Sequence, residues 1–122
     1  TLALAKLKVW GETAVQMPQG TTYDVIVDKN KQLIRIQIKA TTVVSNTMNF
    51  TFQRGFHGSS KGTFDYENDD FNIACCVNLY DQKVLFSHGV QKSISWKRKI
   101  FLREGAEYQS WESALQELKK SA

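Results

Sequence analysis

Three polar residues on neighbouring stretches of this sequence, Asp24, Gln37 and Lys39, could together hold a divalent metal against a phosphate group. A carboxylate and a side-chain amide oxygen are hard oxygen ligands of the kind that Mg²⁺ accepts, with waters and phosphate oxygens completing its shell. Hydrolysis of a phosphodiester bond needs such a cation and a water made nucleophilic at neutral pH. A neighbouring lysine can position that water or stabilise the charge that develops on the phosphate. The three residues therefore favour a nuclease.

The surrounding residues predict the two strands that would bring these groups together. From Gln32 to Ala40 apolar and polar residues alternate, which is typical of a half-buried strand. The stretch Tyr23–Val27 predicts a second strand, and residues 28–31 have the length and composition of a hairpin loop. Because side chains alternate along a strand, the amide and the lysine must share one face. The carboxylate can approach that face across an antiparallel pair.

The same residues also fit a plainer interpretation. Asp24 would then end a strand, and Gln37 and Lys39 would belong to a solvated face of the sheet. One aspartate near a Gln-x-Lys pattern does not separate these alternatives by its spacing alone. The wider sequence around the three residues has to decide between them.

The run from Pro18 to Thr42 contains a Tyr-Asp strand, a hairpin and then the sequence Arg-Ile-Gln-Ile-Lys. This order resembles the PD-(D/E)XK nuclease superfamily, and most closely its group I intron-associated homing endonucleases. Weaker likeness, in residues 2–8, 69–74 and 102–103, extends over most of the chain. The resemblance implies metal-ligating roles for Asp24, Gln37 and the backbone carbonyl of Ile38. It implies catalytic roles for Asp24, Gln37 and Lys39.

The resemblance also implies a fold and an activity. The expected fold is a single α/β domain over residues 1–122, restriction-endonuclease-like, with a central mixed β-sheet flanked by helices. The expected activity is site-specific hydrolysis of double-stranded DNA that depends on Mg²⁺ or Mn²⁺. Two alternatives stay open, namely a Holliday-junction resolvase and a non-catalytic DNA-binding module of the same fold.

One acidic residue of the family pattern is missing from the chain as given. The family places a further glutamate in its first helix, and residues 1–9 contain no acid. We therefore expect an incomplete N-terminus, with that glutamate upstream of Thr1. Glu12 is the only early acid, and it follows Gly11, a residue type that often ends a helix. The sequence predicts Glu12 as a surface residue at a strand start.

Composition is consistent with a small protein that binds a polyanion. A chain of 122 residues is expected to form one domain with one modest core. Its net charge of +4 favours a nucleic acid as partner, although many basic domains bind nothing anionic. No apolar run is long enough for a membrane span, and no signal peptide is visible. Cys75 and Cys76 are expected to be small buried residues on opposite faces of a strand, in a reducing cytoplasm.

Two further stretches could contact DNA. The run from Gln53 to Lys61 combines cations, hydroxyls, glycines and an aromatic residue, as phosphate-binding loops do. An ordinary exposed loop is the alternative there. The densest basic cluster is Lys97–Lys99, which would contact phosphates or be simply solvated. The predicted DNA-binding residues are Arg35, Arg54, His57, Ser59, Lys61, Lys97 and Lys99.

The remaining elements are predicted from periodicity and capping. A closing helix is expected from Trp111 to Lys120, with Ser110 as its N-cap and an apolar face that packs on the sheet. Because one domain of this size offers one active site, cleavage of both strands suggests a homodimer or homotetramer, joined through apolar residues at Phe50–Phe56. The other predicted elements are a helix at Leu2–Val9 and strands at Thr13–Met17, Asn72–Tyr80, Val84–Phe86 and Ser93–Phe101.

Overall fold

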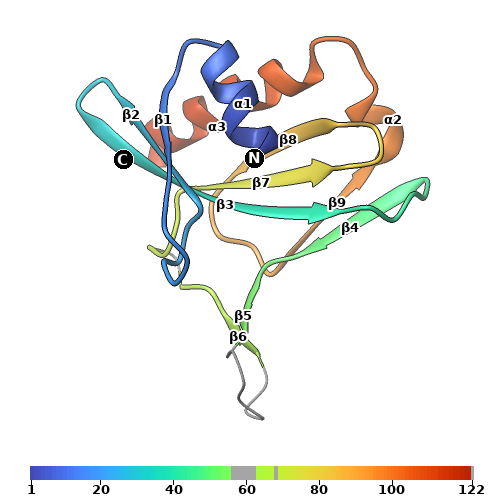
Figure 1. Cartoon of the computed structure of the whole chain (residues 1–122), viewed down its shortest axis with the longest axis horizontal. Helices are drawn as coiled ribbons and strands as arrows, with labels where there is room; N and C mark the ends of the chain where they lie inside the picture. The colour runs from blue at the N-terminus through green and yellow to red at the C-terminus, as the bar shows by residue number, and fades with distance from the viewer. Residues whose placement is uncertain (56–62, 68, 122) are drawn as a thin grey trace.

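A five-stranded mixed sheet forms the centre of the computed structural model, which describes residues 1–55, 63–67 and 69–121 (Figure 1). Its strand order is β1-β2-β3-β7-β8, with β3 and β7 parallel and the other neighbours antiparallel. The pairs β4–β9 and β5–β6 form two smaller sheets. This arrangement confirms the predicted central mixed sheet with flanking helices. The elements are α1 (Leu2–Val9), β1 (Thr13–Gln16), β2 (Val25–Lys29), β3 (Gln32–Thr41), β4 (Thr47–Thr51), β5 (Gln53–Gly55), β6 (Thr63–Asp65), β7 (Ile73–Asn78), β8 (Lys83–His88), β9 (Ser93–Lys97), α2 (Arg98–Phe101) and α3 (Ala106–Ser121).

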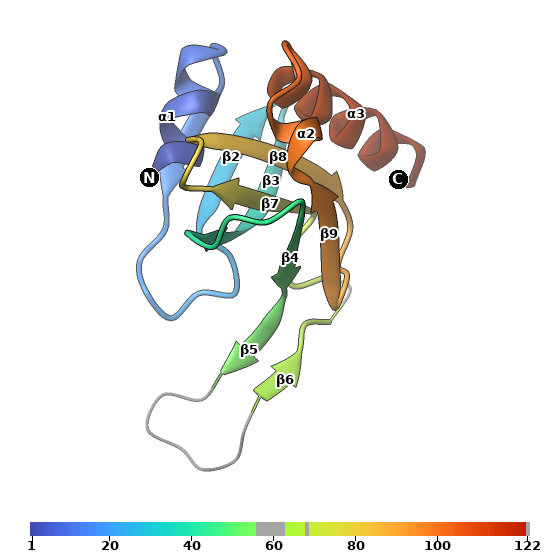
Figure 2. The same cartoon turned by 90° about the vertical axis from the view of Figure 1, so that its right-hand side faces the viewer.

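The central sheet is covered differently on its two faces. Helices α1 and α3 lie on one face, and β4 and β9 lie on the other, while the β5–β6 hairpin projects away (Figures 1 and 2). Every residue of β7 is buried, because both of its faces are covered. Cys75 belongs to the core cluster under the helices and Cys76 to the cluster on the opposite face. Both thiols are free and buried, as the sequence predicts.

The predicted hairpin between β2 and β3 is confirmed. Asn30 and Lys31 form its turn with φ of 53° and 65°, the left-handed values that suit a tight antiparallel hairpin. The register pairs Val25 with Ile36, and both side chains are fully buried under the helices. Strand β2 begins at Val25, two residues later than predicted, so Asp24 lies just before it.

Helix α3 begins at Ala106, and the prediction that Ser110 caps a helix starting at Trp111 is wrong. Ser110 lies inside the helix, where its hydroxyl donates to the Glu107 carbonyl at 2.7 Å and accepts from the Phe86 backbone N–H at 2.9 Å. The hydroxyl therefore serves a neighbouring strand and not the start of its own helix. The predicted apolar face is confirmed, with Trp111 and Ala114 buried and with Leu115 and Leu118 packed against the same core.

The outer edge of the sheet at β8 is covered by side chains of α3. Glu107 Oε2 accepts from the Val84 N–H at 2.9 Å, and Ser110 Oγ accepts from Phe86. Lys6 also contacts Glu107, at 3.0 Å, and so ties α1 to the same point. Side chains therefore satisfy strand N–H groups that another strand could otherwise bind. At the opposite edge, no strand of the described part of the chain pairs with the outer side of β1.

The predicted strand Ser93–Phe101 is wrong beyond Lys97, where the chain turns into the short helix α2. Arg98 begins this helix and holds Asp81 in a two-pronged ion pair, with Nε–Oδ2 at 2.9 Å and Nη2–Oδ1 at 2.8 Å. Phe101, at the end of the helix, is fully buried in the second core cluster. This tertiary anchoring of Arg98 and Phe101 overrides the local alternation that predicts a strand.

The Arg98–Asp81 pair makes part of the protein's stability depend on pH. The hydrogen bond from Arg98 lowers the pKa of Asp81 from 3.8 to about 2. Because the folded-state pKa is depressed, this stabilisation is present above the ordinary pKa and is lost as the pH falls through about 2. We expect the difference in free energy of unfolding between wild type and Asp81→Asn to decrease as the pH falls from 3.8 to about 2. Urea unfolding at several pH values measures this difference.

Asp28→Asn is the matched control, because Asp28 is exposed and has no ion-pair partner among the described residues. The difference in free energy of unfolding between Asp28→Asn and wild type should not decrease in this way as the pH falls. A difference for Asp81→Asn that stays constant down to pH values near the lowered pKa would contradict the assignment.

Two further expectations from the sequence are corrected by burial. Phe50 and Phe52 are each 1% exposed and pack inside the second core cluster, so they do not join subunits. Phe56 lies outside the described residues.

Glu12 is not a freely exposed surface residue, because its side chain is 10% exposed. It accepts hydrogen bonds from Lys29 Nζ at 3.0 Å and Trp111 Nε1 at 2.7 Å, and so links the hairpin to α3.

Candidate active site

Asp24 is fixed to both of its neighbouring strands. Its backbone N–H donates to the Ile36 carbonyl at 2.8 Å, and its own carbonyl accepts from Met17 at 2.8 Å. Its carboxylate oxygen Oδ2 accepts from the Ile38 N–H at 2.9 Å. The side chain thereby takes the place of a strand partner at the point where β2 has not yet begun. The predicted approach of this carboxylate to β3 is therefore present.

Gln37 and Lys39 lie on one face of β3, next to that carboxylate. The hairpin register, extended by one residue, places Gln37 directly opposite Asp24. Gln37 is half-buried, and its Nε2 lies 3.4 Å from the Ile38 carbonyl oxygen. Lys39 is exposed and has no hydrogen-bond or ion-pair partner among the described residues. A carboxylate, a carboxamide and a backbone carbonyl thus meet at Gln37 and Ile38, and Lys39 follows on the same face of β3 as Gln37.

Strand β7 lies beside β3, on the side away from β2, and contributes uncharged side chains there. Ala74 and Cys76 are in register with Gln37 and Lys39, and both are buried. Burial raises the pKa of the Cys76 thiol to about 12. Burial also raises the pKa of Cys75 well above its ordinary value, and the nearby charges of Cys76 and Asp24 act in the same direction. Both thiols therefore stay protonated at neutral pH and cannot serve as nucleophiles.

Three oxygen atoms of these residues are hard donors of the kind that a divalent cation prefers. They are the Asp24 carboxylate, the Gln37 carboxamide oxygen and the Ile38 carbonyl. No group of three His, Cys, Asp or Glu side chains that could hold a metal occurs in the described ranges. A cation here would thus have one protein charge and two neutral oxygens. That donor set suits Mg²⁺, which keeps several waters and takes one or two carboxylates with substrate phosphates.

Arg35 is the predicted DNA-binding residue that lies nearest the site along β3. Its guanidinium stands 5.9 Å from the centre of the Tyr23 ring. Its backbone N–H donates to Asn72 Oδ1 at 2.8 Å, and its Nε makes a long contact of 3.5 Å to the same oxygen. Sequence reasoning missed Asn72, which no local motif distinguishes from an ordinary residue at the start of a strand.

The other predicted DNA-binding residues are placed only in part. Lys97 and Lys99 are exposed at the start of α2, where they line a hollow of about 410 Å³ together with Asn46 and Thr47. Arg54 is placed by its backbone, in β5. His57, Ser59 and Lys61 lie outside the described residues.

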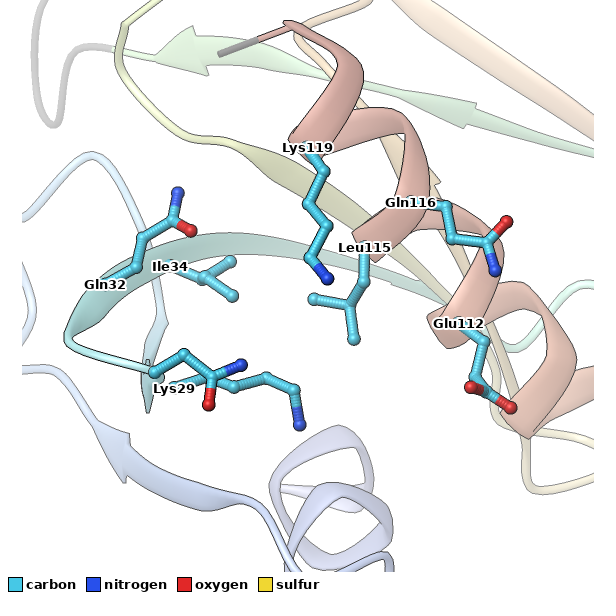
Figure 3. Close-up of a pocket in the computed structure, with 8 residues that line it drawn as sticks. Lys29, Gln32, Ile34, Glu112, Leu115, Gln116 and Lys119 are labelled. Atoms are coloured by element: carbon cyan, nitrogen blue, oxygen red, sulfur yellow. The ribbon is translucent and has the colours of Figure 1, made fainter.

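A second hollow of about 250 Å³ lies between the β2–β3 turn and α3, and neither Lys97 nor Lys99 lines it. Figure 3 shows Lys119 and Leu115 extending from α3 toward the strand that carries Ile34, with Lys29 at the other end of the hollow. Neither this hollow nor the one beside Lys97 contains any of the three candidate catalytic residues. The Asp24 site is thus separate from both.

Comparison with known proteins identifies the family. The family model described as PD-(D/E)XK endonuclease matches residues 3–120, almost the whole chain. The chain belongs to the PD-(D/E)XK endonuclease family. Its central sheet with flanking helices is accordingly the restriction-endonuclease-like fold. Nucleases of this family generally use divalent metals, and membership indicates a nuclease.

One solved structure supports the fold assignment. It is described as a bacterial homing endonuclease, I-Ssp6803I, and it is 15% identical to this chain in sequence. The match covers 95% of this chain and 87% of that one, with a TM-score of 0.66. No curated protein sequence matches the chain. In the described part of this PD-(D/E)XK chain, no helix has the length and apolar character needed to cross a membrane.

Proposed function

We propose that this protein is a divalent-metal-dependent endonuclease that hydrolyses phosphodiester bonds in double-stranded DNA at a specific site, as homing endonucleases do. The observation that carries the proposal is the contact of Asp24 with Ile38, next to Gln37 and Lys39 on β3, with a Lys39 side chain that is exposed and pairs with no described residue. The family match and the homing-endonuclease neighbour support it. A net charge of +4 suits a polyanionic substrate.

Each residue then has a defined role. Asp24, Gln37 and the Ile38 carbonyl would hold Mg²⁺ or Mn²⁺, which when bound neutralises phosphate charge and lowers the pKa of a water. The Lys39 ammonium group orients the attacking water and stabilises negative charge that builds on the phosphate oxygens. The water gives up one proton to solvent as its oxygen bonds to phosphorus, the bond to the leaving sugar oxygen breaks, and that oxygen takes up a proton from solvent. The hydrogen bond from Ile38 N–H keeps the Asp24 carboxylate oriented throughout.

Cleavage of both strands of a duplex in a single binding event calls for two such sites. We propose that a homodimer or homotetramer supplies them, because one chain carries a single Asp24 and a single Lys39 in this arrangement.

The proposal is tested by incubating the protein with supercoiled plasmid, linear duplex and four-way junction DNA. We expect cutting of plasmid and duplex in Mg²⁺ or Mn²⁺, none in EDTA, and retained binding without metal, read by gel electrophoresis and mobility shift. Strong preference for the junction would instead indicate a resolvase. Binding without cutting in either metal would indicate a non-catalytic module.

A further inference from the structure

Arg35 is a positively charged side chain that no described anion neutralises. Lys6, Lys29 and Arg98 each contact a carboxylate. Arg35 contacts none within the described ranges. A half-buried arginine that keeps its charge unpaired in the free protein can offer that charge to an anionic ligand.

Neighbouring residues contact the Arg35 guanidinium at its Nε and over the Tyr23 ring, and leave its two terminal nitrogens without a described partner. The Tyr23 ring lies beneath it at 5.9 Å, and the Asn72 amide oxygen approaches Nε. The two terminal nitrogens have no hydrogen-bond partner in the part of the chain that the structure describes. Those nitrogens form the fork with which arginine binds phosphate through two parallel hydrogen bonds.

Asn72 fixes the strand position from which Arg35 projects. Its backbone N–H donates to the Arg35 carbonyl at 2.9 Å, and its carbonyl accepts from Gly89 at 2.8 Å. Its side-chain oxygen accepts from the Arg35 N–H at 2.8 Å. The backbone of Arg35 is thus held on both its donor and its acceptor by one residue, at the point where β7 begins.

The location connects this fork to the candidate active site. Arg35 shares a face of β3 with Gln37 and Lys39, two and four residues away, or roughly 7 and 13 Å along a strand. Tyr23 immediately precedes Asp24 in the chain. Both partners of the cation–π contact therefore belong to the segments that carry the proposed metal ligands.

We propose, on the basis of the nuclease function proposed above, that Arg35 binds a backbone phosphate of the DNA next to the one that is cut. Its terminal nitrogens make the contact, and Tyr23 and Asn72 are positioning residues that orient the guanidinium. An arginine that already lies over a ring and contacts an amide oxygen loses less conformational freedom on binding than a free one, so its contact contributes to affinity at lower entropic cost. The contact sets where the duplex lies relative to Asp24 and Lys39.

The test measures duplex binding by fluorescence anisotropy in EDTA over a range of salt concentrations. The probe is a labelled duplex of mixed sequence. Removing one phosphate contact should reduce the slope of log K against log salt by about 0.9. We expect this reduction for Arg35→Gln, whereas Arg35→Lys should keep the slope and still bind more weakly, because lysine lacks the fork.

Tyrosine variants separate positioning from charge. Tyr23→Leu should weaken binding without changing the slope, and Tyr23→Phe, which keeps the ring, should bind nearly as wild type does. Lys8→Gln is the matched charge control, because Lys8 is exposed on α1, on the opposite side of the sheet. Circular dichroism verifies that each variant is folded.

The outcomes distinguish this inference from the function on which it rests. If wild type neither binds nor cuts DNA, the proposed function fails and this inference fails with it. If wild type binds and cuts but a folded Arg35→Gln protein keeps the full salt slope, the phosphate contact alone is overturned. If Tyr23→Leu binds as wild type does, Tyr23 is not a positioning residue.

Discussion

Replacing Lys39 by alanine, or Asp24 by asparagine, is expected to reduce the rate of DNA cleavage by roughly 10²–10⁴-fold, the contribution that a positioned acid–base group or charge stabiliser makes. The Lys39 side chain is exposed and makes no hydrogen bond or ion pair with a described residue, so its removal should leave the fold intact. The Asp24→Asn side chain keeps the shape of the aspartate but loses the charge that a divalent cation requires. The measurement is single-turnover cleavage of plasmid in Mg²⁺, beside duplex binding in EDTA.

Matched controls make the result specific. Asp28→Asn removes an exposed carboxylate from β2, the strand that follows Asp24, and Lys8→Ala removes an exposed lysine from the helical side. Both should cleave within a few-fold of wild type. Full activity in a folded Lys39→Ala protein would rule out the assigned role of that lysine. Equal loss of binding and cleavage in Asp24→Asn would indicate a structural role for the hydrogen bond from Ile38.

Replacing Trp111 by alanine is expected to cost about 3–5 kcal/mol of the free energy of unfolding, as removal of a large core side chain does. Trp111 is fully buried, and its ring meets Phe86 edge-to-face with centroids 5.0 Å apart. Its Nε1 also donates to Glu12 at 2.7 Å. Trp111→Phe, which keeps a ring but loses this donor, should cost about 1–3 kcal/mol. Urea unfolding followed by far-ultraviolet circular dichroism measures both.

A double-mutant cycle between Trp111→Phe and Glu12→Gln isolates the hydrogen bond. A coupling of about 0.5–3 kcal/mol is expected for two residues in direct contact. Additive effects would mean that the tryptophan stabilises through packing alone. Glu112→Ala is the surface control on the same helix, because Glu112 is exposed, and it should change stability by less than about 0.5 kcal/mol.

The candidate site was predictable because it depends on local sequence rules. Alternation in residues 32–40 and the turn at Asn30 fix which side chains share a face, and the hairpin register then sets Asp24 opposite Gln37. What the sequence could not reveal is how Asp24 is held. The bond from Ile38 N–H arises because β2 starts only at Val25, a boundary that propensity does not specify.

Failures of prediction share a physical cause, which is contact between residues distant in sequence. Ser110 resembles a helix cap, but its hydroxyl is occupied by Phe86, 24 residues away. The alternation around Arg98 predicts a strand, but its ion pair with Asp81 starts a helix. Phe50 and Phe52 lie in a polar stretch and so suggested an interface, yet both are part of the core. Local patterns contain no information about such partners.

The side-chain cover on β8 has a consequence for how copies of this chain could meet. A β-sheet that grows without limit by adding copies needs two uncovered edge strands in every copy, one to pair with each neighbour. In the central sheet, Glu107 and Ser110 accept hydrogen bonds from N–H groups of the edge strand β8. Among the described strands, the other edge of that sheet is β1, which is available for pairing. A pairing of two copies through their β1 strands about a twofold axis would use the uncovered edge of both central sheets and leave neither of these sheets another. We therefore expect association through this sheet to end at a pair of copies.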